Sequence, residues 1–237
     1  MTSLAYPPIR QSDRFGNFFV IKNKQGYVAN KNDNKKILKL YEKRENETIY
    51  IENEFVEDEF CLVGHELAPT YLSDAEKVDF LYIFFQPRKK SAYVFIYEMK
   101  KSIGKCEKTI LHMFSQCTAS IKFALSIVDS MNDYVRVQKS VGVFTENWDD
   151  RALNEMIKTK ENQIKTTKSG FLQKKLCAQN SITKSQLNIL KKIASRKFVF
   201  DNEELPFDCR LMSRNSRSYS LKVSDGTFHQ RSPAIKE

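Results

Sequence analysis

The sequence lacks several features that would place the protein in a familiar class. No apolar segment approaches the roughly 18 residues that a membrane-spanning helix requires, so we expect no contact with a membrane. The five Cys residues form no C-x-x-C pair and the three His residues are equally scattered, which argues against a structural zinc site. An odd number of dispersed cysteines, with no apolar leader before them, is typical of a reduced intracellular compartment, and we expect a cytoplasmic protein. There is no internal repeat.

What the sequence does contain indicates a folded protein with a large core. Its 237 residues are 41% hydrophobic and include 17 Phe and 10 Tyr. A chain of this length can bury a core without stabilising disulfides or metal ions, either as one domain or as a core domain with a smaller appendage.

The net charge of +10 is confined to one block of the chain. Residues 1–150 and residues 201–237 are each neutral, whereas residues 151–200 hold 12 Lys and Arg against two Glu. A concentrated positive charge favours a polyanionic partner, because binding to phosphates releases counterions. The alternative is a solvated helical face whose lysines serve solubility.

Hydrophobic periodicity predicts a mixed α/β (α+β) fold with helices on a central sheet. Apolar, aromatic runs separated by a polar turn containing Pro predict a hairpin of central strands. A three- and four-residue apolar period predicts a long buried helix. The expected elements are a hairpin at 18–30, a helix at 34–46, a strand pair at 47–64, hairpin strands at 77–85 and 91–100, a helix at 107–129, a strand at 134–147, helices at 150–165 and 181–197, and a short strand at 218–223.

The hairpin carries the candidate chemistry. Asp79 lies in its first strand, and Glu98 and Lys100 lie near the end of its second. Side chains at i and i+2 of a strand point to the same face, and neighbouring strands lie about 4.8 Å apart, so the three can converge. Two carboxylates could hold Mg²⁺, and a lysine beside them suits phosphodiester hydrolysis. The competing interpretation is that Glu98 and Lys100 are the hydrated end of a strand that enters a loop, and that Asp79 is an acid facing an edge.

Asp79 followed by Glu98, Met99 and Lys100 resembles the PD-(D/E)xK (restriction-endonuclease-like) nuclease superfamily. The resemblance covers about residues 35–147 and implies that Asp79 and Glu98 bind Mg²⁺ or Mn²⁺, while Lys100 positions or polarises water. It also implies a phosphate or water contact for Gln116 on the following helix. The family's Pro before the Asp is Val78 here.

Two further family positions stay open. The acid that relatives carry on the first helix could be Glu42 or Glu45. His65 could be an upstream ligand, as in some relatives, or an ordinary polar side chain.

These observations predict a metal-dependent nuclease acting on nucleic acid, with DNA favoured, in restriction, repair or anti-phage defence. The alternatives are a non-catalytic nucleic-acid-binding or scaffold subunit that keeps the fold, and a helix-turn-helix reader that includes residues 181–194. A homodimer or a place in a multi-protein complex would fit. We expect a lead-in with a hairpin at 1–33, the nuclease-like core at 34–148, a basic helical region at 149–200 and a polar tail at 201–237. The expected phosphate contacts are Lys174, Lys175, Lys191, Lys192, Arg196 and Lys197.

Overall fold

The computed structural model describes nine segments of the chain. These are residues 18–22, 37–42, 47–54, 60–65, 78–131, 133–167, 173–211, 218–224 and 227–231, and side chains are described for 61–62, 78–131, 133–165 and 183–211. The elements in chain order are β1 (Phe18–Lys22), β2 (Ile37–Glu42), β3 (Glu47–Glu54), β4 (Phe60–His65), β5 (Phe80–Gln86), the short 3-10 helix η2 (Pro87–Lys89), β6 (Ser91–Ile103), α1 (Glu107–Asp129), β7 (Arg136–Trp148), α2 (Asp150–Thr167), α3 (Gln173–Ala194), β8 (Lys197–Phe200), β9 (Glu203–Leu211), β10 (Ser218–Ser224) and β11 (Thr227–Arg231).

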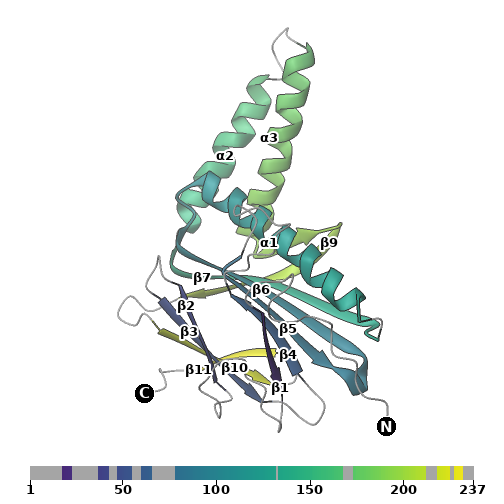
Figure 1. Cartoon of the computed structure of the whole chain (residues 1–237). Coiled ribbons are helices and arrows are strands. Elements are labelled where there is room, and N and C mark those ends of the chain that lie inside the picture. Colours follow the sequence, from purple (N-terminus) through teal and green to yellow (C-terminus); the bar gives the residue numbers. More distant parts are fainter. Residues whose placement is uncertain are drawn as a thin grey trace.

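A seven-stranded mixed sheet with the order β1-β4-β5-β6-β7-β9-β8 forms the centre of the molecule (Figure 1). β5 and β6 are an antiparallel hairpin, closed by η2 and by Lys90 in the left-handed conformation (φ 48°). β6 pairs in parallel with β7, and β7 in parallel with β9. A second sheet has the order β11-β10-β3-β2. The expected α/β fold is therefore confirmed.

The two faces of the central hairpin differ in chemistry. Alternate residues such as Ile83, Val94 and Ile96 join an aliphatic core with α1. The residues between them are aromatic, and Phe80 and Tyr97 face each other across β5 and β6 with ring centroids 6.0 Å apart. In Figure 1, α1 lies above the seven-stranded sheet and the strands of the second sheet lie below it.

Helices α2 and α3 form a hairpin that projects away from the sheet, which we call the helical arm (residues 150–194) (Figure 1). Asp149 begins it as an N-cap, because its Oδ1 accepts a hydrogen bond of 2.9 Å from the backbone N–H of Ala152. At the base of the arm, the Lys160 ammonium lies 2.7 Å from Glu107 of α1 and donates to Gln186 of α3 at 2.9 Å. One buried cation therefore joins all three helices.

Several sequence predictions agree with these elements. The predicted hairpin matches β5 and β6, although β6 continues to Ile103. The helix at 107–129 is α1, and the strands at 134–147 and 218–223 match β7 and β10 within one or two residues.

Other predictions are wrong. Residues 37–42, expected in a helix, form β2 and pair antiparallel with β3, because tertiary pairing of this apolar segment outweighs its helical spacing. The strands at 47–64 are present as β3 and β4, but they belong to different sheets. Of the hairpin expected at 18–30, the structure describes only residues 18–22, and these form β1, which pairs with β4.

The C-terminal part of the chain also differs from expectation. Helix α3 begins at Gln173, eight residues before the expected start at Ser181, and ends at Ala194. Residues 203–211, which we placed in a polar tail, are the sheet strand β9. Residues 227–231, which we placed in the same polar tail, form β11. β9 pairs with β7, which is distant in the chain, so local sequence did not indicate it, whereas β11 pairs with the neighbouring strand β10.

Candidate functional site

The structure brings Asp79, Glu98 and Lys100 together where β5 begins beside β6. Asp79 is the residue directly before β5, and its backbone N–H donates to Glu98 Oε2 at 3.0 Å. In return, the backbone N–H of Met99 donates to Asp79 Oδ2 at 2.7 Å. Lys100 Nζ forms an ion pair with Glu98 Oε1. Each carboxylate thus accepts a hydrogen bond from the backbone beside the other carboxylate. These two hydrogen bonds fix the positions of both side chains.

This cluster, which we call the acidic-lysine site (Asp79, Glu98 and Lys100), is mostly shielded from solvent. Glu98 is 1% exposed, whereas the Lys100 side chain is 21% exposed and Asp79 is partly exposed. Burial raises the pKa of Glu98 despite the opposing effect of Lys100. Burial works to lower the pKa of Lys100, but the carboxylates of Glu98 and Asp79 outweigh it and raise that pKa. Lys100 is therefore a permanent ammonium at neutral pH.

Helix α1 covers the aliphatic side of the acidic-lysine site. Gln116 is buried on this helix, as is its neighbour Cys117. Burial raises the pKa of Cys117, and the charge of Glu98 contributes to the same shift. His112 lies one helical turn before Gln116, and its electrostatic effect works to lower the pKa of Glu98 against the larger effect of burial. The sequence analysis missed His112, although its i, i+4 spacing from Gln116 indicates the same helix face.

The donor set of the site fits a hard divalent cation. Mg²⁺ prefers oxygen ligands and is usually held by one or two carboxylates together with waters and substrate phosphates. Asp79 and Glu98 each place one carboxylate oxygen on the backbone N–H beside the other, and Lys100 binds the second oxygen of Glu98, so a cation would share that carboxylate with the ammonium. Within the residues that the structure describes, no cluster of three or more His, Cys, Asp and Glu side chains surrounds a common point.

The additional ligands suggested by the family resemblance are not supported. Glu42 was expected on a first helix, but it ends strand β2 in the four-stranded sheet. Glu45 lies outside the described residues, and so does the side chain of His65. Glu42 is therefore wrong as a first-helix acid, because residues 37–42 form a strand, whereas Glu45 and His65 stay predictions.

Several cations of the basic block are paired within the chain. Lys191 lies 2.6 Å from Glu161, and Glu204 holds both Lys192 and Lys197. The Arg196 guanidinium stacks on Trp148 at 3.5 Å from the ring centroid. Lys174 and Lys175 lie in α3, but their side chains are outside the described part.

Three other lysines on the helical arm face solvent. Lys158, Lys165 and Lys184 are exposed, and none forms an ion pair with the side chains that the structure describes. Lys158 and Lys165 lie on α2, and Lys184 lies on α3. We call them the arm lysines. They offer positive charge to an external partner without breaking an internal ion pair.

Comparison of the chain with protein-family models, curated proteins and solved structures found no match. In the described part of the chain, no helix is both long and apolar enough to cross a membrane.

Proposed function

We propose that the protein is a metal-dependent nuclease that hydrolyses phosphodiester bonds of nucleic acid, with DNA favoured. The observation that supports this most is the reciprocal hydrogen bonding of Asp79 and Glu98, with Lys100 beside them. Burying a carboxylate on an apolar strand costs free energy of folding. A buried carboxylate beside a second acid is typical of a functional site.

Each residue of the acidic-lysine site has a defined task in this proposal. Asp79 and Glu98 would hold Mg²⁺ or Mn²⁺, which supplies Lewis acidity toward a phosphoryl oxygen and lowers the pKa of water. Lys100 is held protonated by its two acidic neighbours, so it donates hydrogen bonds to phosphoryl oxygen and does not act as a base. Gln116 orients the substrate or water from α1.

A nuclease assay tests the proposal directly. Single- and double-stranded DNA and RNA are incubated with the protein in Mg²⁺, in Mn²⁺ and in EDTA. We expect cleavage that needs the cation and falls at least about 100-fold in Glu98→Gln, because removal of one electrostatic group typically costs that much. Lys101→Gln is the matched control, since Lys101 is exposed on the opposite face of β6. Full cleavage by both Glu98→Gln and Asp79→Asn would refute the proposal.

A non-catalytic nucleic-acid-binding or scaffold subunit is the alternative. It is favoured by one observation, that Glu98 is 1% exposed and already neutralised by Lys100 within the chain. In this case the same assay shows no turnover with either cation, while nucleic acid is still bound in a salt-sensitive way.

The arm lysines are our proposed phosphate contacts for either function. Replacing Lys158, Lys165 and Lys184 together with Gln should lower the slope of log K against log salt by about two to three, because each lost phosphate contact removes about one. Lys122→Gln on α1 is the control, as Lys122 is exposed outside the arm. An unchanged slope in the triple variant would exclude the arm lysines as phosphate contacts.

A further inference from the structure

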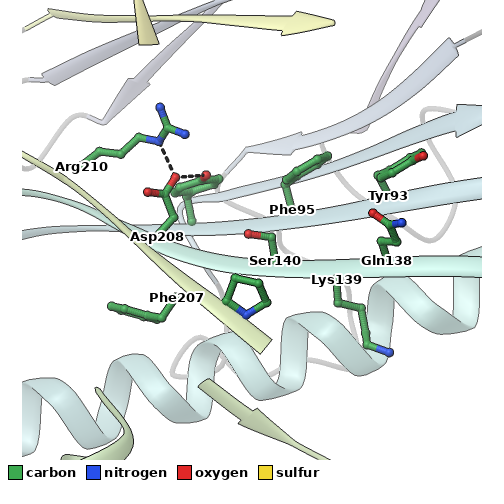
Figure 2. Close-up of a pocket in the computed structure, with 10 residues that line it drawn as sticks. Tyr93, Phe95, Gln138, Lys139, Ser140, Phe207, Asp208 and Arg210 are labelled. Carbon is green, nitrogen blue, oxygen red and sulfur yellow. Dashed lines mark hydrogen bonds and ion pairs between the residues drawn. The ribbon is translucent and has the colours of Figure 1, made fainter. Parts of the chain in front are cut away.

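A cavity of about 520 Å³ lies on the aromatic face of the sheet, over β6, β7 and β9 (Figure 2). Its volume is in the range of sites for small molecules. Tyr97 lines this cavity, and its sequence neighbour Glu98 points to the other face of β6. The cavity is therefore separated from the acidic-lysine site by the thickness of the sheet, and an inference about it does not depend on the proposed nuclease activity.

One glycine makes the polar end of the cavity possible. The Tyr97 hydroxyl on β6 donates to Asp208 Oδ2 on β9 at 2.8 Å, across the intervening strand β7. Gly142 of β7 lies opposite Tyr97, and a Cβ at this position would come within 2.4 Å of the Tyr97 ring and 2.6 Å of the Asp208 carbonyl oxygen. Only a residue without a side chain lets the tyrosine ring cross the strand.

Arg210 completes this network. Its Nε donates to the same Asp208 Oδ2 at 2.5 Å. Burial, followed by the negative charge of Asp208, raises the pKa of Tyr97, so the hydroxyl remains a neutral donor. Asp208 Oδ2 thus receives two donors, which fixes the carboxylate against the sheet and leaves Oδ1 as the acceptor for a further donor.

The rest of the lining defines the shape of a ligand. Figure 2 shows Tyr93 and Phe95 along β6, with Ser140 and Gln138 beside them on β7. Aromatic rings next to small polar groups suit a flat ring that is stacked on one side and hydrogen-bonded at its edge. The Arg210 guanidinium offsets the charge of Asp208, so a cationic ligand gains little binding free energy from this carboxylate. An anionic group next to Asp208 would be repelled by the carboxylate.

We propose that this cavity binds a neutral, planar, amino-substituted heteroaromatic ring, of which adenine, cytosine and guanine are the common biological examples. The ring packs over Phe95 beside Ser140, and its amino group donates to Asp208, which lies level with Tyr97 two residues further along β6. Carboxylates accept from the exocyclic amino groups of bases in the same way in nucleic-acid recognition. The base could belong to a free nucleoside or to an unpaired nucleotide of a strand, since both present the same edge.

Isothermal titration calorimetry with matched nucleosides tests the assignment. The pairs are guanosine with inosine, adenosine with purine riboside, and cytidine with 2-pyrimidinone riboside, and the two members of each pair differ only in the amino group. In at least one pair the amino-bearing nucleoside should bind about 10-fold or more tightly than its partner, because a hydrogen bond to a charged group has this effect. Asp208→Asn should reduce that preference to about threefold or less, whereas Asp133→Asn, at an exposed position, should leave it unchanged.

A second variant keeps the test decisive if Asp208→Asn unfolds. Ser140→Leu fills the cavity from β7 without touching the hydrogen bonds of Asp208, and it should abolish nucleoside binding while the circular dichroism spectrum is retained. Equal affinity within all three pairs, or no binding of any nucleoside at millimolar concentration, would overturn the proposal. Titration with single-stranded oligodeoxyadenylate identifies the source, because binding that Ser140→Leu abolishes indicates a strand, and binding of nucleosides alone indicates a free metabolite.

Discussion

Replacing Lys100 with Met should destabilise the protein in a way that depends on pH. The substitution keeps an unbranched side chain of similar length but removes the counter-charge of Glu98, which is 1% exposed. Removal of one partner of a buried ion pair typically costs about 3 to 5 kcal/mol. Glu98 keeps its hydrogen bond from the backbone of Asp79, so we expect the lower end, about 3 kcal/mol at pH 7.5.

The pH dependence follows from the direction of the Glu98 shift. Burial raises the pKa of Glu98 in the folded protein, and Lys100 opposes this shift. Without Lys100 the pKa rises further, so the folded variant binds a proton more tightly than the unfolded chain does. The free energy of unfolding of the variant must then fall as pH rises from about 4.5 toward the folded pKa. At pH 5 the cost of the substitution should therefore be smaller than at pH 7.5.

Urea denaturation followed by circular dichroism at the two pH values measures both quantities. Lys101→Met is the matched control, because Lys101 is exposed on the other face of the same strand, and it should change stability by less than about 0.5 kcal/mol. The double variant Glu98→Gln with Lys100→Met should recover part of the loss. A cost for Lys100→Met that is below about 1 kcal/mol, or equal at pH 5 and pH 7.5, would refute the reasoning.

Three further predictions concern other parts of the fold. Gly142→Ala should lower the free energy of unfolding by about 1 to 3 kcal/mol, measured in urea, because the added methyl group meets the Tyr97 ring; wild-type stability would contradict this. Asp149→Ala should cost about 1 kcal/mol in the same measurement, whereas Asp149→Ser should retain most of the cap; an equal loss in both would argue against capping. In an NMR titration Glu204 should show a pKa of about 2, lowered by hydrogen bonds from Lys192 and Lys197, and an ordinary value near 4 would show that these pairs do not persist in solution.

The local part of the fold could be predicted from the sequence. The hairpin of β5 and β6 and helix α1 follow from continuous apolar runs and from a three- and four-residue period, which depend only on neighbouring residues. The shared face of Glu98 and Lys100 likewise follows from strand alternation, and their ion pair bears it out. The closeness of Asp79 followed from the antiparallel pairing of two strands that are adjacent in the chain.

The distant pairings could not be predicted in this way. Strand β9 contains Pro206 and charged residues, and only Leu205 and Phe207 mark its buried side, so its composition resembles that of a turn-rich tail. Its partner β7 ends at Trp148, with the helical arm between them. For the same reason the bond between Tyr97 and Asp208, 111 residues apart, had no signal in the local sequence. The ion pairs of Lys191 and Lys192 also depend on tertiary neighbours that charge counting does not reveal.

The position of β9 has a consequence for folding during synthesis. β7 can pair with β6 on one side once both have left the ribosome, but among the described strands it is β9 that covers its other edge. About 50 residues separate the two strands, so at 5 to 20 residues per second that edge stays open for roughly 3 to 10 s. An open strand edge is a template for pairing with another chain. The helical arm, which can form from local contacts in this interval, therefore sets how long the nascent sheet is exposed to aggregation.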